Sequence, residues 1–254
     1  LGSDGFLGKQ LLCYFAKNGS FDVVGCTRRT GEEQYAGFRK VRSDLTCFDA
    51  VCDLLSELRP DVILNFAGAT VGSARTLYLA NTVVPTNVAL AIVARNSGCR
   101  LIHVGSAAEY GASDLQLIDE TVECRPISLY GHSKLAATNF LMSERASRGL
   151  QVIVLRPFNM VGEINSPRQV LGAFVDKVLE QRRTGALQPI RMGYLGAIRD
   201  FFCVEDLFLL ILRLIEKPRA EFDIFNVCSG HGPSARDVLR SLPARLGSIE
   251  VVKD

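Results

Sequence analysis

Side chains that bind metals are scarce in this sequence. It has three histidines, and its eight cysteines, at positions 13, 26, 47, 52, 99, 124, 203 and 228, include no Cys-x-x-Cys pair. Zinc sites and redox-active pairs commonly use that close spacing. We therefore predict no metal site, and we interpret the cysteines as buried free thiols of a protein from a reducing cytoplasm.

A strong net charge and a membrane-spanning apolar run are also missing. The 29 basic and 27 acidic residues leave a net charge of +2, which gives no reason to expect a nucleic acid or an anionic membrane as a partner. The apolar run at residues 207–212 is far shorter than the roughly 20 residues that cross a bilayer. No signal-peptide pattern is visible, and a cytoplasmic location is expected.

Apolar residues, in contrast, are plentiful and recur in a regular order. They make up 48% of 254 residues, enough for one large core or for a main domain with a smaller lobe. Short continuous apolar segments predict strands at residues 22–26, 62–67, 101–106, 152–155 and 224–227. Helical periodicity predicts helices at residues 6–18, 48–58, 74–97, 130–148, 170–181, 204–216 and 235–245. This alternation predicts an α/β fold, a doubly wound (Rossmann) parallel sheet that binds ligands at the carboxyl ends of its strands.

A candidate proton-transfer site follows the predicted strand 101–106. Ser106 ends that strand, and Tyr130 and Lys134 stand one helical turn apart, so their side chains share a helix face. An ammonium beside a phenol favours the phenolate, so we predict that Lys134 lowers the pKa of Tyr130 from its usual value near 10. Ser106 can hydrogen-bond an oxygen whose proton Tyr130 supplies or removes. An ordinary amphipathic helix is the alternative interpretation of Tyr-x-x-x-Lys alone.

The first eight residues form a glycine-rich loop. Gly2, Gly5 and Gly8 are spaced as Gly-x-x-Gly-x-x-Gly, one residue away from the dinucleotide fingerprint, and a helical pattern begins among them at Phe6 and Leu7. Such glycines let backbone N–H groups and a helix N-terminus approach a pyrophosphate. A glycine-rich loop without a ligand is the alternative. We also expect a strand ahead of the loop, outside the printed sequence.

The end of the predicted strand 22–26 bears on the choice of cofactor. An acidic side chain there would bind the ribose 2′-hydroxyl and select NAD, whereas arginine accommodates the 2′-phosphate of NADP. The sequence has Thr27, Arg28 and Arg29, with no carboxylate before Glu32. Two guanidiniums suit a phosphate in charge and geometry. NADP is therefore favoured over NAD, with a pair of solvated loop arginines as the alternative.

Further short motifs occur in an order typical of one group of enzymes. They are Asp44-Leu45, residues 62–68, Gly105-Ser106-Ala107-Ala108-Glu109-Tyr110-Gly111, Arg156-Pro157-Phe158-Asn159, Arg199-Asp200-Phe201 and Asn226-Val227-Cys228-Ser229-Gly230. Together with the glycine loop and Tyr-x-x-x-Lys, they cover nearly the whole chain. The sequence resembles the extended short-chain dehydrogenases/reductases of the NAD-dependent epimerase/dehydratase family, and among them the GDP-4-keto-6-deoxymannose reductases.

This resemblance implies roles for the motifs. It implies an NADP-binding Rossmann domain mainly over residues 1–158 and a substrate lobe mainly over 159–254, with residues about 200–228 returning to the first domain. The further cofactor contacts that it implies are Asp44 and Leu45 at the adenine, and Phe66, Ala67, Gly68 and Pro157. The implied substrate contacts are Asn159 at the sugar or its phosphate, Arg199 at the diphosphate and Arg168 as a second candidate. Surface ion pairs are the alternative for both arginines. Glu109 could reach hexose hydroxyls or be a solvent-facing turn residue.

The resemblance also implies a homodimer. Its interface would be formed by the helices 74–97 and 130–148 of each subunit. Their apolar residues could serve either that interface or the core; examples are Leu77, Val84, Val88, Ile92, Leu135 and Phe140.

The residues after Ser106 narrow the reaction. Dehydratases of this group carry acidic residues there, because elimination of water needs an added acid and base, whereas this chain has Ala107 and Ala108. The double epimerase-reductases of the group have a cysteine at the position of Ala108 and a histidine downstream of the Arg-Pro-x-Asn segment, and the loop 161–168 here has no histidine. The remaining hypothesis is NADPH-dependent reduction of a nucleotide-linked 4-keto-6-deoxyhexose, with Tyr130 as the acid. A nucleotide-sugar 4-epimerase, a reductase of a smaller carbonyl and a non-catalytic NADP-binding protein are the alternatives.

Overall fold

The structure is a computed structural model, in which the chain divides into two compact units. It describes residues 1–18, 21–28, 38–95, 98–113, 117–162, 170–185, 190–192, 198–217, 223–234, 236–237 and 251–253. The first unit comprises Leu1–Pro157 and Leu207–Val227, and the second comprises Phe158–Asp206 and Cys228–Asp254.

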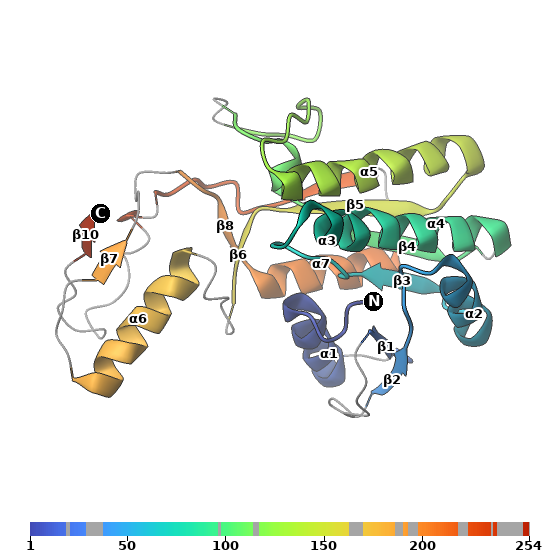
Figure 1. Cartoon of the computed structure of the whole chain (residues 1–254), viewed down its shortest axis with the longest axis horizontal. Coiled ribbons are helices and arrows are strands. Elements are labelled where there is room, and N and C mark those ends of the chain that lie inside the picture. The colour runs from blue at the N-terminus through green and yellow to red at the C-terminus, as the bar shows by residue number, and fades with distance from the viewer. Residues whose placement is uncertain are drawn as a thin grey trace. The chain divides into compact units, whose positions relative to one another are not determined.

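A four-stranded parallel sheet forms the centre of the first unit (Figure 1). Its order is β3 (Val62–Asn65), β4 (Arg100–Val104), β5 (Val152–Pro157) and β9 (Ile224–Val227). Every residue of β5 is buried, as are all of β4 except its first. Continuous apolar strands of this kind are stable only where helices cover both faces of the sheet.

Helices cover that sheet in two groups. α2 (Phe48–Leu58), α4 (Val84–Arg95) and α5 (Leu129–Arg148) pack one against the next. α1 (Phe6–Asn18) and α7 (Val204–Glu216) meet through the rings of Tyr14 and Phe208, whose centroids are 5.6 Å apart. The two groups lie on opposite faces of the sheet (Figure 1), so the predicted doubly wound arrangement is confirmed.

The predicted helix 74–97 is divided into three parts. α3 (Ala74–Tyr78) leads through a π-helical segment, Leu79–Val83, into α4, whose second residue is Pro85. A proline has no N–H to donate to the preceding turn, which is a common cause of such an irregularity. By length and composition the stretch Ala74–Arg95 could cross a membrane. Val88 and Ala89 within it are completely buried in the protein, as in the core helix of a globular fold.

The glycine loop lies between the central sheet and a separate strand pair. β1 (Val24–Thr27) pairs in parallel with β2 (Arg39–Arg42), a strand that the sequence analysis misses. Leu1 bonds β3 through the Leu64 carbonyl at 2.6 Å, and the N–H of Gly2 bonds the Cys26 carbonyl at 3.1 Å. Residues 1–3 therefore connect the two strand systems. A cavity of about 1070 Å³, lined by parts of β1, β3, α1 and α2, adjoins this connection and does not include Ser106, Tyr130 or Lys134.

The second unit contains short strands that the sequence analysis does not predict. β6 (Asn159–Val161) pairs in parallel with β8 (Phe201–Cys203), and β7 (Ile190–Met192) with β10 (Val251–Lys253). The helix predicted at 170–181 is α6 (Val170–Thr184). Most of the helix predicted at 235–245 lies outside the described residues.

Candidate active site

Lys134 is held inside the first unit. α5 begins after Ser128, whose hydroxyl caps it by accepting the Gly131 N–H at 3.0 Å. One turn into the helix, the Lys134 ammonium donates to the Val104 carbonyl at 2.8 Å, and only 6% of the residue is exposed. It also lies next to Gly68, where a Cβ atom would be 3.3 Å from Nζ. Burial lowers the pKa of Lys134 to about 8.

Tyr130 and Ser106 are brought together by the fold. The Ser106 hydroxyl lies close enough to the phenol to favour, by itself, a lower pKa for Tyr130. Burial of the phenol outweighs this effect of Ser106 and, together with the nearby Glu109 carboxylate, raises the pKa of Tyr130 above its ordinary value of 10. The predicted lowering is therefore wrong for this structure, because the phenolate is disfavoured by the loss of water. Tyr130 keeps its proton at neutral pH, which suits an acid.

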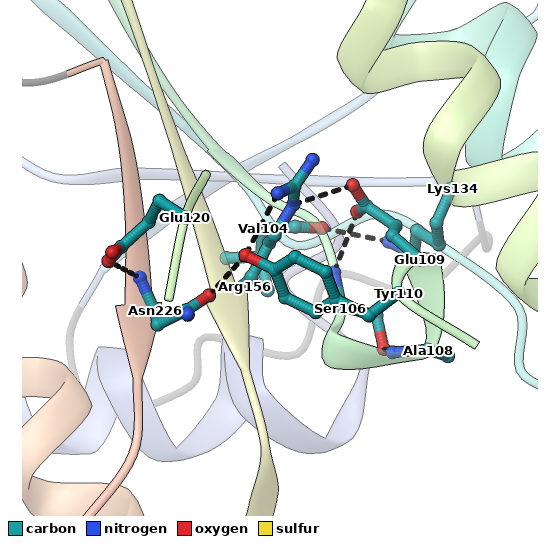
Figure 2. A network of polar contacts seen from close by, with 9 residues as sticks. All are labelled: Val104, Ser106, Ala108, Glu109, Tyr110, Glu120, Lys134, Arg156 and Asn226. Carbon is teal, nitrogen blue, oxygen red and sulfur yellow. Dashed lines mark hydrogen bonds and ion pairs between the residues drawn. The ribbon is translucent and has the colours of Figure 1, made fainter. Parts of the chain in front are cut away.

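Ser106 begins a tight turn after β4. Its hydroxyl oxygen accepts the Ala108 N–H at 3.1 Å, and its own N–H donates to Glu109 Oε1 at 2.9 Å (Figure 2). The two bonds form a capping box around the 3-10 turn Ala107–Glu109. The backbone that presents the Ser106 hydroxyl is therefore fixed by the Ser106 side chain itself and by the side chain of Glu109.

Glu109 occupies a different place from either one expected. Its side chain is completely buried, so the solvent-facing interpretation is wrong. Its oxygens accept the Ser106 N–H and the Arg156 Nε–H, both at 2.9 Å (Figure 2). A carboxylate that is buried and already paired is not available to hexose hydroxyls. The guanidinium that holds this carboxylate belongs to Arg156 of β5, which lies 47 residues away in the chain. A local sequence pattern therefore could not predict the pairing.

The glycine loop has the close backbone contacts that its spacing predicts. Gly2 has φ +76°, and a Cβ atom there would lie 2.7 Å from the Ala67 nitrogen. A Cβ atom on Gly8 would lie 2.2 Å from the Gly2 carbonyl oxygen. The Gly5 N–H closes the turn on the same oxygen at 2.9 Å, and α1 begins at Phe6. Any side chain at Gly2 or Gly8 would therefore collide with neighbouring backbone atoms. A loop of bare backbone at a helix N-terminus is suited to binding a pyrophosphate.

Two asparagines that the sequence analysis misses shape the segment after β3. Asn65 Oδ1 accepts the Ala67 N–H at 3.0 Å, and its amide lies 3.1 Å from His103 Nδ1. Asn81 accepts from and donates to the backbone of Ala69, each at 2.8 Å, and also donates to Ser133 Oγ at 3.0 Å. The segment after β3 is thereby held at Ala67 by Asn65 and at Ala69 by Asn81. In the sequence, each of these asparagines is marked only by being a polar residue within an apolar segment.

A group of three hydrogen-bonded side chains lies at the end of β1: Thr27, Asp4 and Lys40. The Thr27 hydroxyl donates to Asp4 Oδ2, and Lys40 of β2 donates to Asp4 Oδ1 at 3.0 Å. The Thr27 bond and the Lys40 charge together hold the pKa of Asp4 below its ordinary value. Arg28 is exposed, and Arg29 lies outside the described residues. Sequence reasoning missed both Asp4 and Lys40, because the pair joins segments distant in the chain.

The predicted adenine contacts follow β2. Asp44 is exposed and accepts from the Thr46 N–H at 3.0 Å and from its hydroxyl at 2.7 Å. These bonds, with a smaller effect of the Arg28 charge, lower the pKa of Asp44. The Leu45 side chain is buried, and its carbonyl accepts from Asn87 at 3.1 Å.

The remaining candidates are distributed over both units. Pro157 ends β5 opposite Val227 of β9, in the first unit. In the second unit, the Asn159 side chain donates to the Asp200 carbonyl at 2.8 Å. The Asp200 carboxylate accepts backbone N–H groups of Ser229 and His231. The Arg199 side chain is exposed, and Arg168 lies outside the described residues.

The fold, a parallel sheet covered by helices on both faces with a glycine loop at the N-terminus of α1, is typical of proteins that bind a dinucleotide. Residues 1–228 match the NAD dependent epimerase/dehydratase family, and the chain belongs to that family. It is 29% identical over 245 residues to the GDP-6-deoxy-D-talose 4-dehydrogenase of Aggregatibacter actinomycetemcomitans, covering 95% of this chain and 77% of the relative. It is also 29% identical over 218 residues to the GDP-6-deoxy-D-mannose reductase of Pseudomonas aeruginosa, covering 83% and 70%.

A solved structure supports the same family. RMD from Pseudomonas aeruginosa, complexed with NADPH, aligns with a TM-score of 0.81 and 26% identity over 100% of this chain and 83% of that one. Relatives named as 4-epimerases match at 25–28% identity. The resemblance found in the sequence is therefore confirmed, and the chain is an enzyme of the NAD(P)-dependent nucleotide-sugar class.

Proposed function

We propose that this protein uses NADPH to reduce the 4-keto group of a nucleotide-linked 4-keto-6-deoxyhexose. The observation that carries the proposal is the contact between Ser106 and a protonated Tyr130, with Ala107 and Ala108 following the serine. This arrangement can protonate an alkoxide but lacks the added acid and base that a dehydration needs.

The chain's own residues fit the cofactor. The backbone of Gly2, Gly5 and Gly8, with Phe6 and Leu7, would hold the pyrophosphate, because side chains at Gly2 or Gly8 would collide with backbone. The remaining contacts that we propose are Thr27, Arg28 and Arg29 at the adenosine phosphate, Asp44 and Leu45 at the adenine, and Phe66, Ala67, Gly68 and Pro157 along the rest of the dinucleotide. When bound, NADPH supplies the hydride that goes to C4.

Tyr130 and Ser106 act on the oxygen. As C4 is reduced, its oxygen develops negative charge, and the Ser106 hydroxyl can donate a hydrogen bond to it. Tyr130 then gives its proton to that oxygen, and burial keeps this proton in place at neutral pH. Lys134, whose pKa is about 8, is positively charged in most molecules at pH 7 and favours the phenolate that remains.

The substrate contacts are proposed from the second unit. Asn159, Arg199 and Arg168 would bind the sugar and its diphosphate, since a guanidinium can bind two phosphate oxygens at once. Relatives named for GDP-linked and for dTDP-linked 6-deoxy sugars support a nucleotide-linked 6-deoxyhexose, and the test therefore uses both nucleotides.

A homodimer and a cytoplasmic location stay predictions. Leu77, Val84, Val88 and Ile92 are buried in the core and are not available to a subunit interface. Leu135 and Phe140, also named as interface candidates, are half-buried. All eight cysteines lie among the described residues and are free thiols. Only Cys26 and Cys99 are buried, so the interpretation of the cysteines as buried thiols is wrong for the other six.

The test follows NADPH absorbance with GDP-4-keto-6-deoxymannose and with dTDP-4-keto-6-deoxyglucose. Oxidation that disappears in the Tyr130→Phe variant supports the proposal and identifies the nucleotide. If NADPH binds but neither substrate is reduced, the proposal is wrong for these sugars. The same protein would then be assayed for 4-epimerisation of UDP-sugars, the activity for which other relatives are named.

A further inference from the structure

Glu109 and Arg156 form an ion pair that the reduction, as proposed, does not use. The side chains are 0% and 4% exposed, and Glu109 Oε2 accepts from Arg156 Nε at 2.9 Å. Removing two charges from water is costly, and an apolar pair of similar volume is often as stable. Stability alone therefore explains the pair poorly, and its other contacts are more informative.

The second oxygen of the carboxylate acts on Ser106. Glu109 Oε1 accepts the Ser106 N–H at 2.9 Å and so closes the capping box around the catalytic turn. The fit leaves no room for a side chain at Gly105, where a Cβ atom would lie 2.4 Å from Oε1. The carboxylate is thus in contact with the main chain on which the Ser106 hydroxyl is mounted.

Arg156 connects this carboxylate to the sheet. Its Nη1 donates to the Tyr110 hydroxyl at 3.0 Å, and its guanidinium lies 4.7 Å above the Tyr110 ring. The Tyr110 hydroxyl donates to Asn226 Oδ1 at 2.8 Å, and the Asn226 backbone N–H donates to Glu120 at 2.6 Å (Figure 2). The turn after β4 is therefore linked through β5 to β9. Fully satisfied buried networks of this kind hold their members in one arrangement.

The carboxylate also affects the proton-transfer residues. Next to the effect of burial, its charge raises the pKa of Tyr130 and opposes the lowering of the Lys134 pKa. The titratable groups around Glu109 are Arg156 on β5, Tyr130 and Lys134 on α5, Tyr110 beside it in the chain, and Cys124.

We propose that Glu109, held by Arg156, is a positioning residue that fixes Ser106 beside Tyr130 for the reduction. This inference rests on the proposed function. It assigns no contact with the substrate to Glu109. The carboxylate acts through the Ser106 backbone and through its charge near Tyr130.

The test compares Glu109→Gln with Glu144→Gln. Glu144 is the matched control because it is also buried, at 6% exposed, and is paired with an arginine, Arg148, at 2.6 Å on the same helix, α5. Four quantities are measured for each variant: kcat and KM with the keto-sugar, the NADPH dissociation constant, the melting temperature, and the titration of Tyr130. The last uses tyrosine labelled with ¹³C at Cζ, assigned with Tyr130→Phe.

We expect E109Q to lower kcat by about tenfold or more, because a misplaced Ser106 and Tyr130 lose part of the roughly 10²- to 10⁴-fold that acid catalysis contributes. KM and NADPH binding are expected to change little. Without the carboxylate charge the pKa of Tyr130 falls, and the alkaline limb of the rate moves to lower pH. E144Q is expected to lower only the melting temperature. If E109Q also changes only the melting temperature, the positioning role is refuted.

The Tyr130 titration separates the two proposals, because it needs no turnover. If the wild type reduces no keto-sugar but E109Q still lowers the pKa of Tyr130, the proposed function fails and the effect of Glu109 stands. If E109Q changes neither the titration nor kcat, the inference fails.

A double variant covers the case in which E109Q does not fold. E109Q/R156Q replaces the ion pair by two neutral amides and leaves no buried charge without a partner. We expect it to recover most of the melting temperature but not kcat. Recovery of both to wild-type values would show that the carboxylate has no role beyond stability.

Discussion

Two pairs of a carboxylate with a basic side chain support two different parts of the first unit. Glu109 and Arg156 are 0% and 4% exposed, whereas Asp4 and Lys40 are 22% and 8% exposed. The first pair holds the Ser106 backbone, and the second lies at the Thr27 hydroxyl, where the cofactor's adenosine end is proposed.

This difference separates a rigid part of the site from an adjustable one. Neither member of the buried pair can be lost without leaving a charge that water does not reach, so breaking it is costly. Asp4 retains some access to water, so its charge can be solvated when a partner is lost. We call the part of the site around Glu109, Arg156 and Ser106 the catalytic end, and the part around Asp4, Lys40 and Thr27 the cofactor end. We expect substitutions at the catalytic end to change activity and stability strongly, and substitutions at the cofactor end to change them little.

Tyr130→Phe gives the largest effect on activity at the catalytic end. Removing the hydroxyl removes the proposed acid, and such groups contribute about 10²- to 10⁴-fold to rate. We expect kcat to fall by that factor while NADPH fluorescence titration gives an unchanged dissociation constant. A variant that keeps more than half of the wild-type kcat would contradict the role given to Tyr130.

Arg156→Met gives the largest effect on stability. It leaves Glu109 buried without its counter-charge, which typically costs about 3–5 kcal/mol. The free energy of unfolding, measured by urea denaturation, is expected to fall by that amount. A loss below about 1 kcal/mol, the range of exposed pairs, would show that this buried pair contributes no more to stability than an exposed one.

His103 makes the catalytic end sensitive to acid. Burial, and next to it the Lys134 charge, holds the pKa of His103 well below its ordinary value of 6.5. The folded state then resists protonation that the unfolded state accepts below about pH 6.5, so this stabilisation is complete above that pH. It is lost as the pH falls toward the folded-state pKa, by up to about 1.4 kcal/mol per pH unit.

Urea denaturation at several pH values tests the role of His103. The wild type should lose stability from pH 6.5 downward more steeply than His103→Asn, which keeps a hydrogen-bonding side chain but does not titrate. Parallel curves for the two proteins would show that other groups cause the acid sensitivity.

Lys40→Met is expected to change stability least, and it tests the more exposed of the two ion pairs compared above. Because Asp4 can be solvated, we expect a loss of about 1 kcal/mol or less in the free energy of unfolding. The uncompensated Asp4 charge would also weaken binding of NADPH more than of NADH, since NADPH carries an additional phosphate. Equal changes in the two dissociation constants would place the phosphate away from Asp4.

Much of the fold follows from short-range patterns in the sequence. Apolar runs locate the strands β3, β4, β5 and β9, and helical periodicity locates α1, α2, α5 and α7, because burial of apolar side chains has the period of the element. The π-helical segment Leu79–Val83 and the strands β2, β6, β7, β8 and β10 were missed. These are short or irregular, and their pairing depends on partners elsewhere in the chain.

The site divides in the same way. Ser106, Tyr130, Lys134 and the glycines could be proposed from the sequence, since each belongs to a motif with a characteristic spacing within one element or turn. The sequence could not assign Arg156 to Glu109, Lys40 to Asp4, or a raised pKa to Tyr130. A charge's partner and its access to water are set by segments that only the tertiary structure brings together. The sequence by itself therefore determined which groups are candidates for the reaction, and the fold decided how each of them is held and charged.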